Sequence, residues 1–232
     1  MIQFNATTRT FKLDTKNTTY VIAICDEEQF LGHVYYGARI SDDAAYLLRT
    51  EEAPFVPSKN NRDRSSFFDT FPTEYPGNQV GDYRESAIAV RDANNHSAVQ
   101  FVYCGHRITV EKPALKGLPA TFAPKGEVMT LELDVADPVL GLEATLFYSV
   151  FEKEDVITRS ITVKNASGET IYLTKIMSLS LDMDQEDYRM LTRLMGARAS
   201  DGLPQHRIRK AECGIDQRRV LPSGTSVCST CV

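Results

Sequence analysis

The longest regular pattern of apolar and polar positions lies in residues 129–163. Apolar side chains alternate with polar ones in three successive runs, over residues 129–135, 142–150 and 157–163. Successive side chains of a strand point to opposite faces of a sheet, so this alternation predicts strands with one buried and one solvent-facing side. Turn-like breaks at residues 137–141 and 152–155 separate the runs. We therefore predict three neighbouring antiparallel strands.

The apolar face of these strands needs a second sheet to cover it, which predicts an all-β fold built as an antiparallel β-sandwich. Shorter runs rich in β-branched and aromatic residues predict further strands. They lie at residues 11–13, 19–24, 30–36, 88–91, 99–104, 107–110 and 170–182. In the last run, Ile171, Leu173, Met177, Leu179 and Leu181 are expected on one side. A short helix is predicted only at residues 186–194.

Residues 50–76, here called the proline-rich segment, break this pattern. They contain four prolines, five aromatic residues and the charged residues Glu51, Glu52, Arg62, Asp63 and Arg64. The prolines exclude a long helix or a central strand, and long loops in compact domains are usually functional or disordered. The aromatic residues argue against disorder. A carboxylate and a guanidinium on one loop can hold sugar hydroxyls, but from the residues alone a solvated charged loop is the simpler interpretation.

Composition narrows the class of protein. The 232 residues are 42% hydrophobic and 25% charged with a net charge of −5, which does not favour a nucleic-acid partner. No apolar run approaches the roughly 18 residues that cross a bilayer, and the N-terminus does not resemble a secretion signal, so no membrane partner is expected. Five cysteines cannot all pair within one chain, which favours free thiols and a cytoplasmic location.

The last residues, 197–232, lose all alternation and are predicted to be an irregular tail. From Arg193 to Arg219 there are seven basic and three acidic residues. Cys228 and Cys231 have the spacing of zinc ligands, and Cys213 and His206 could complete a site. No second close pair of ligands exists, so two incidental thiols are the preferred interpretation and no metal site is assigned.

Other residues with chemical potential have simpler interpretations. The four histidines, at positions 33, 96, 106 and 206, have no serine or cysteine at a catalytic spacing. Asp82 and Arg84 are interpreted as a structural clamp, with contact to a ligand as the alternative. Arg159 shares a face with Ile157 and Ile161, so either a carboxylate pairs with it or that face is partly wet. No phosphate loop or nucleophile motif is present, and no cofactor is expected.

Several stretches together resemble one family, the N-terminal domain of bacterial α-galactosidases of glycoside hydrolase family 36. In chain order they are His33-Val34-Tyr35-Tyr36-Gly37, Glu74-Tyr75-Pro76 with Gly81-Asp82-Tyr83-Arg84, Lys112-Pro113 with Gly117-Leu118-Pro119-Ala120-Thr121, Asp155-Val156-Ile157-Thr158-Arg159-Ser160, and the strand at residues 178–184. The resemblance covers about residues 3–196, and its specificity comes from the order of the motifs.

The resemblance implies a large supersandwich-like β-domain at residues 3–196, followed in the family by a catalytic (β/α)₈ barrel. It implies retaining hydrolysis of terminal α-galactosides such as melibiose and raffinose, with both catalytic carboxylates in the barrel. The barrel is not in this sequence, so whether the chain is an enzyme stays open and it is expected to be inactive alone. The family's domain builds a homo-oligomer, and its proline-rich loop reaches sugar in a neighbouring subunit's barrel. By this alignment the substrate-binding residues are Glu52 and Arg64, with no catalytic residue.

The sequence departs from the family after Ala197. Arg198 stands where the family typically has a tryptophan, and the chain contains none. Residues 197–232 are therefore interpreted as the irregular tail of a truncated or frame-shifted copy. The resulting function is the non-catalytic N-terminal portion of an α-galactosidase. The alternative from another class is a stand-alone carbohydrate-binding β-sandwich module.

Overall fold

The computed structural model describes residues 1–25, 28–48, 72–79, 82, 84–114 and 121–181, with strands at 189–191, 205–207, 219–221 and 226–231. The chain divides into two compact units. The first comprises Met1–Leu181 with Ile215–Val232, and the second is Asp182–Gly214. The second unit contains one strand pair, β11 (Arg189–Leu191) antiparallel to β12 (Gln205–Arg207). The glutamate and arginine predicted to bind substrate, Glu52 and Arg64, lie outside the described residues.

The largest sheet of the first unit is built on the three strands that alternation predicts. They are β7 (Val128–Asp137), β8 (Leu142–Phe151) and β9 (Val156–Asn165), paired antiparallel without a register shift. The full order is β14-β9-β8-β7-β6, with β6 (Val102–Thr109) and β14 (Ser226–Cys231) at the edges. The prediction of three neighbouring antiparallel strands is confirmed. The apolar positions of β8 are buried, as the alternation requires.

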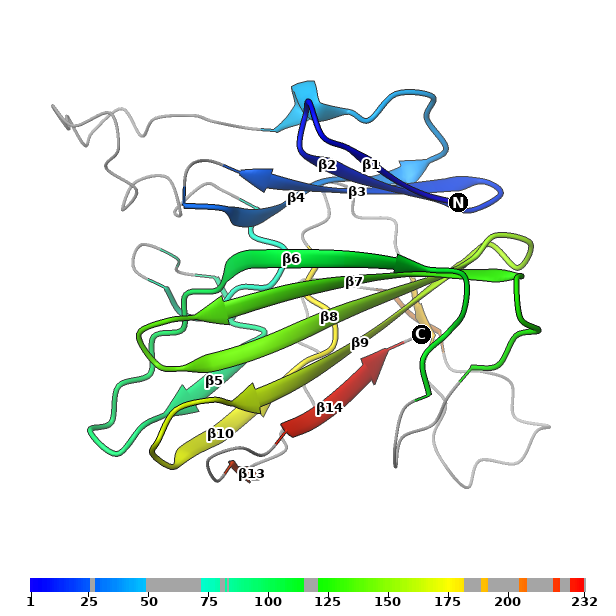
Figure 1. Cartoon of the computed structure of the whole chain (residues 1–232). Coiled ribbons are helices and arrows are strands. Elements are labelled where there is room, and N and C mark those ends of the chain that lie inside the picture. The colour runs from blue at the N-terminus through cyan, green and yellow to red at the C-terminus, as the bar shows by residue number, and fades with distance from the viewer. Residues whose placement is uncertain are drawn as a thin grey trace, which may run out of the picture. The chain divides into compact units, whose positions relative to one another are not determined.

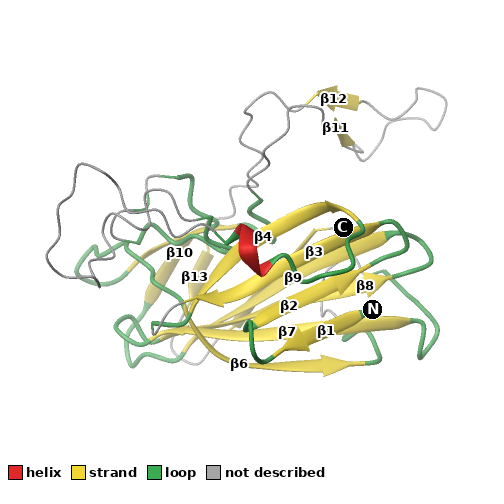
Figure 2. Ribbon diagram, turned by 90° about the horizontal axis from the view of Figure 1, so that it is seen from above, coloured by secondary structure: helices red, strands yellow, loops and turns green. Residues whose placement is uncertain are grey.

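Two smaller sheets cover the apolar face of this large sheet. The first has the order β1-β2-β3-β4 and lies above the strands β6 to β9 in Figure 1. Its strands are β1 (Ile2–Asn5), β2 (Thr10–Asp14), β3 (Thr18–Cys25) and β4 (Phe30–Ala38). The second has the order β13-β10-β5, formed by β13 (Arg219–Leu221), β10 (Ile171–Ile176) and β5 (Ile88–Arg91). Seen from above in Figure 2, β10 and β13 lie at one end of the large sheet, and Figure 1 places them below the four-stranded sheet. The chain is therefore all-β and sandwich-like, as predicted.

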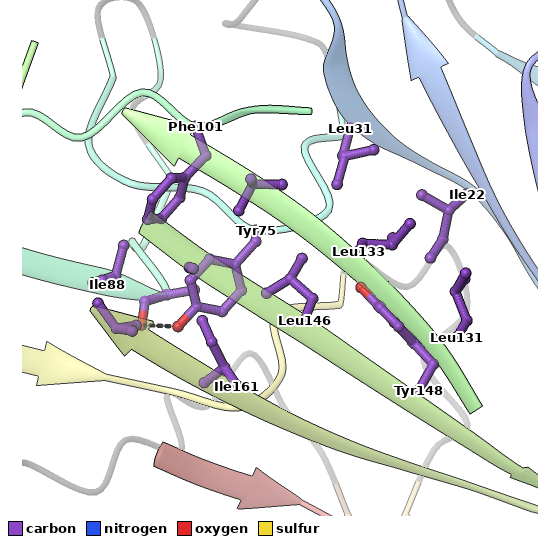
Figure 3. Packing of buried hydrophobic residues seen from close by; sticks show 14 of the residues in the cluster. Ile22, Leu31, Tyr75, Ile88, Phe101, Leu131, Leu133, Leu146, Tyr148 and Ile161 are labelled. Atoms are coloured by element: carbon purple, nitrogen blue, oxygen red, sulfur yellow. Dashed lines mark hydrogen bonds between the residues drawn. The ribbon is translucent and has the colours of Figure 1, made fainter. Parts of the chain in front are cut away.

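All three sheets share one hydrophobic core. Leu133, Leu146 and Ile161 from the large sheet belong to the same buried cluster as Ile22 and Ile88 from the two covering sheets. Figure 3 shows these side chains gathered between the layers, with Tyr75 and Phe101 among them. Burial of apolar surface on this scale is the main term that favours folding. The sandwich therefore depends on both covering sheets packing on one face of the large sheet.

The outer side of the four-stranded sheet is also covered, in part by residues 39–48, here called the strap. The Lys12 ammonium donates to the carbonyl oxygen of Ile40 at 2.7 Å. Asp43 accepts hydrogen bonds from Asn5 at 2.9 Å and from Thr10 at 3.0 Å. The bond to Ile40 gives the buried Lys12 ammonium a partner on this polar face. The strap ends in a 3-10 turn, η1 (Ala45–Leu47), just before the proline-rich segment.

Bulges change two of the predicted strands. Predicted strands at residues 99–104 and 107–110 are in fact the single strand β6, with a register shift between Tyr103 and Gly105. The strand predicted at residues 170–182 is shortened to β10, which has a shift between Leu173 and Lys175. One extra residue inverts the alternation, so Ile176 is buried in the core and Met177 is only partly buried. Met177, just beyond the end of β10, packs against the same core as Ile171 and Leu173 but is only partly buried.

Two predictions near the C-terminus also differ from the structure. The helix predicted at residues 186–194 is wrong, because its centre is strand β11, whose backbone pairs with β12. Residues 197–232, predicted as an irregular tail, contain β12, β13 and β14. Strand β14 pairs with β9 over six residues, from Ser226↔Lys164 to Cys231↔Arg159. An edge strand is held mainly by its neighbour's backbone and needs no alternating pattern, which is why the sequence did not reveal it. No helix in the described part of the chain is long and apolar enough to span a membrane.

The assigned core predicts that truncating a buried side chain costs much more stability than truncating an exposed one. Leu133→Ala removes a fully buried side chain and should destabilise the protein by about 2–5 kcal/mol, because it leaves a cavity. Val139→Ala is the matched control, because Val139 is 92% exposed, and should change stability by less than about 0.5 kcal/mol. Urea unfolding followed by circular dichroism measures both. Equal effects would contradict the assigned core.

Candidate functional site

The proline-rich segment returns to the sandwich along strand β4. The amide of His33 donates to the carbonyl oxygen of Pro72 at 2.7 Å, and the amide of Glu74 donates to that of Leu31 at 2.9 Å. Gly32 and Thr73 form an antiparallel bridge between these two bonds. Residues 72–74 therefore extend the four-stranded sheet at its β4 edge and cover backbone groups that would otherwise lack partners.

The side chain of Glu74 is inserted between the two layers and is completely buried. Its Oε1 lies 2.8 Å from Nη2 of Arg159 on β9. The hydroxyl of Tyr148 on β8 donates to Oε1 at 2.7 Å, and that of Tyr20 on β3 donates to Oε2 at 2.8 Å. Nδ1 of His33 lies 3.6 Å from Oε2. One carboxylate thus joins both layers to the returning chain.

Arg159 completes this group, here called the Glu74 cluster (Glu74, Arg159, Tyr20, Tyr148 and His33). Its Nη2 also lies 3.0 Å from the Tyr148 hydroxyl, and its guanidinium carbon is 4.6 Å from the centre of the Tyr148 ring. Its side chain is only 6% exposed. Of the two alternatives for Arg159, pairing with a carboxylate is confirmed and a wet face is excluded. Figure 3 shows the Tyr148 side chain directed into the space between the sheets.

The electrostatics of the cluster follow from burial and pairing. Burial alone would raise the pKa of the Glu74 carboxyl, but the Arg159 guanidinium, with the hydrogen-bond donors around it, holds that pKa below its usual value. Burial raises the pKa of the Tyr20 and Tyr148 hydroxyls, so both remain neutral donors. The cluster is therefore a buried ion pair with satisfied oxygens.

A second set of contacts holds the chain that follows Glu74. Nε of Arg84 lies 3.0 Å from Oδ1 of Asp82, which confirms the interpretation of this pair as a clamp. Nη2 of Arg84 donates to the Thr73 hydroxyl at 3.0 Å. A Cβ atom added to Gly77 would lie 2.4 Å from the carbonyl oxygen of Val99, so only glycine allows this close backbone approach. Residues 72–79, 82 and 84 are thus held at both the sheet edge and the core.

The remaining candidate residues do not form a catalytic or metal site in the described part of the chain. His96 pairs with Asp92, with 2.8 Å between Nδ1 and Oδ2, and His106 lies 2.6 Å from the Tyr103 hydroxyl. No group of three or more metal-ligating side chains converges among the residues that the structure describes. The backbone of Cys228 and Cys231 lies in β14, whereas Cys213 is outside the described residues, so the zinc alternative stays untested.

Comparison with known proteins identifies this arrangement. Residues 29–220 match the model of the glycosyl hydrolase family 36 N-terminal domain. The chain belongs to this family. It is 36% identical over 190 residues to α-galactosidase AgaA of Geobacillus stearothermophilus, covering 81% of this chain and 26% of that protein. It is 33% identical over 202 residues to the bifunctional α-galactosidase/sucrose kinase AgaSK of Mediterraneibacter gnavus, covering 86% of this chain and 21% of that protein.

Solved structures agree with the assignment to the family 36 N-terminal domain. The galactosidase domain of AgaSK superposes with a TM-score of 0.74 at 33% identity, covering 82% of this chain and 27% of that one. α-Galactosidase AgaB of Geobacillus stearothermophilus gives a TM-score of 0.73 at 34% identity, covering 82% and 26%. The chain therefore spans about a quarter of the length of the relatives that it matches.

The sequence pointed to only part of the Glu74 cluster. Arg159 could be found because a charged residue interrupts an apolar face, and such a residue needs a buried partner. Glu74, Tyr20 and Tyr148 lie 85, 139 and 11 residues away from it in the chain. No local pattern connects these positions, so the partner of Arg159 could not be identified before the fold was known.

Removing one charge of the buried pair should be costly. Glu74→Gln leaves Arg159 buried without its counter-ion, and we expect a loss of about 3–5 kcal/mol in the free energy of unfolding. The double variant Glu74→Gln/Arg159→Met should recover part of this loss, because it removes the unpaired charge. Glu143→Gln breaks an exposed pair with Lys164 and should cost less than about 1 kcal/mol. Urea unfolding measures all three, and a Glu74→Gln cost as small as that of Glu143→Gln would contradict the assigned role.

The lowered pKa of Glu74 predicts how this stability depends on pH. As the pH falls below about 5, the unfolded carboxyl takes up a proton first while the folded one stays ionised, so acid favours unfolding. Between about pH 5 and pH 3 the wild-type chain should lose more stability than Glu74→Gln/Arg159→Met. Thermal unfolding across this range measures the difference, and parallel curves for the two proteins would rule the pairing out as its source.

Proposed function

We propose that the chain is the N-terminal, non-catalytic portion of a retaining α-galactosidase that acts on terminal α-galactosides such as melibiose and raffinose. Membership of the family 36 N-terminal domain supports this, as do its relatives named α-galactosidases. Related structures of Geobacillus stearothermophilus AgaA variants contain raffinose and stachyose. In this proposal the bond is broken in a barrel outside this sequence. The chain alone does not hydrolyse substrate.

The observation that carries the proposal is the attachment of the proline-rich segment. The strap precedes it on the outer side of the four-stranded sheet, and Glu74 anchors its end between the layers. A segment fixed at both ends can present Glu52 and Arg64 at a defined place. In this role Arg64 donates hydrogen bonds to sugar hydroxyls and Glu52 accepts them, in the active site of a neighbouring subunit.

The proposal includes a homo-oligomer in the cytoplasm, with neither nucleic acid nor membrane as a partner. Tyr46 and Leu47 at the end of the strap are 75% and 42% exposed, which gives an apolar contact next to the proline-rich segment. Cys25 and Cys104 are free thiols, which suits a reducing compartment. The net charge of −5 is unfavourable for binding a polyanion.

A chimeric enzyme tests the proposed role of Arg64. This chain would replace the matching quarter of Geobacillus stearothermophilus AgaA, and hydrolysis of an aryl α-galactoside and of raffinose would be measured. We expect activity in the chimera and none in the chain alone. Arg64→Ala should raise KM for raffinose roughly tenfold or more, because a hydrogen bond from a charged group contributes about 1.5–3 kcal/mol.

Lys59→Ala is the matched control, since it removes a positive charge from the same segment. It should leave KM within about twofold of the parent chimera, less than the effect of one lost hydrogen bond. Equal KM values for Arg64→Ala and Lys59→Ala would overturn the assignment of Arg64. Turnover by the highly purified chain alone would overturn the non-catalytic role.

A further inference from the structure

A shallow hollow lies at the end of the β13-β10-β5 sheet, away from the Glu74 cluster. Its volume is about 640 Å³, and its lining includes Arg91, Asp92, Asn95, Glu169 and Tyr172. Arg91 on β5 and Tyr172 on β10 are directly opposite each other in the register of the two strands. Directly opposed side chains on neighbouring strands lie on the same face of the sheet. The two residues therefore share its solvent-facing side.

The turns that flank the hollow are held by their own hydrogen bonds. On one side, Oδ1 of Asp92 accepts from the amides of Asn94 and His96, both at 2.8 Å. On the other side, Oδ1 of Asn165 accepts from the amide of Ser167 at 3.0 Å. Neither turn uses the side chains of Asn95 or Glu169. The turns that form the walls of the hollow are therefore held without the side chains of Asn95 and Glu169.

Three of the polar side chains that line the hollow have no partner in the part of the chain that the structure describes. Within the described part of the chain, the side chains of Arg91, Asn95 and Glu169 make no hydrogen bond or ion pair. Elsewhere on the surface, charged side chains are commonly paired, as Arg107 is with Glu132 at 2.7 Å. Tyr172 is 49% exposed between these groups. A guanidinium donor, a carboxylate acceptor and an amide therefore surround an accessible aromatic ring.

This combination matches the chemistry of a sugar. One face of a pyranose ring presents C–H groups, which pack on an aromatic ring, and its hydroxyls both donate and accept hydrogen bonds. Arg91 is positive whereas Asp92 and Glu169 are negative, so the mixed charge disfavours a strongly charged ligand. We propose that this hollow is a second carbohydrate-binding site, which takes one ring of a neutral saccharide. Tyr172 stacks on the ring, Arg91 donates to its hydroxyls and Glu169 accepts from them.

Titration of raffinose into the full 232-residue chain, followed by calorimetry or ligand-observed NMR, tests this site. We expect binding with a Kd on the order of millimolar, as for a shallow site of few contacts. Tyr172→Ala and Arg91→Ala should each weaken it at least about tenfold, the effect of one lost contact. Tyr172→Phe keeps the ring and should bind within about threefold of wild type. Phe122→Ala, a change at another exposed aromatic residue, should leave binding unchanged.

The outcomes separate this site from the proposed role of the proline-rich segment. If Arg64→Ala loses raffinose binding and Tyr172→Ala keeps it, the sugar binds at the proline-rich segment. That result would overturn the proposed site in the hollow and leave the proposed function intact. A raffinose concentration of about 50 mM is far above a millimolar Kd, so no binding by the wild-type chain there would also overturn the proposed site. A change of oligomeric state in Tyr172→Ala without loss of sugar binding would make the hollow a protein interface instead. Circular dichroism of each variant confirms that it is folded.

Discussion

Arg159 and Glu74 place two opposite charges in the centre of a hydrophobic sandwich. Taking a charge out of water is expensive, so neither residue would be stable there without the other. The cost is offset only because the geometry satisfies nearly every oxygen, with the Arg159 guanidinium at 2.8 Å and two tyrosine hydroxyls as further donors. Such a pair adds little net stability compared with apolar residues of the same size. Its effect is to require one arrangement of the chain segments that carry it.

The segments joined in this way are far apart in the sequence. Tyr20 comes from the four-stranded sheet, Arg159 and Tyr148 come from the large sheet, and Glu74 comes from the end of the proline-rich segment. An apolar core would tolerate small shifts between the layers, but a buried carboxylate loses its hydrogen bonds when its donors move. The cluster therefore fixes where the proline-rich segment rejoins the sandwich. This is the property that a family 36 N-terminal domain needs if that segment is to reach a sugar.

The same scaffold separates two tasks. The core side of the sheets is devoted to packing and to the buried pair, and no catalytic group is found there in the described residues. The two surfaces proposed for recognition are the proline-rich segment and the hollow around Tyr172. Both combine an arginine, a carboxylate and a nearby aromatic residue, the combination that suits neutral hydroxyl-rich ligands. Both proposals thus place function in loops and strand ends carried by the sandwich.

The sequence by itself determined the strands β7, β8 and β9, because strict alternation of apolar and polar residues fits a sheet with one buried face. It also determined that Arg159 needs a buried partner and, through the order of its motifs, the family. Only the tertiary structure decided that this partner is Glu74, that β14 completes the large sheet, and that a bulge in β10 turns Ile176 into the core. These features depend on contacts between distant residues or on backbone pairing at an edge, and neither leaves a periodic signal in the sequence.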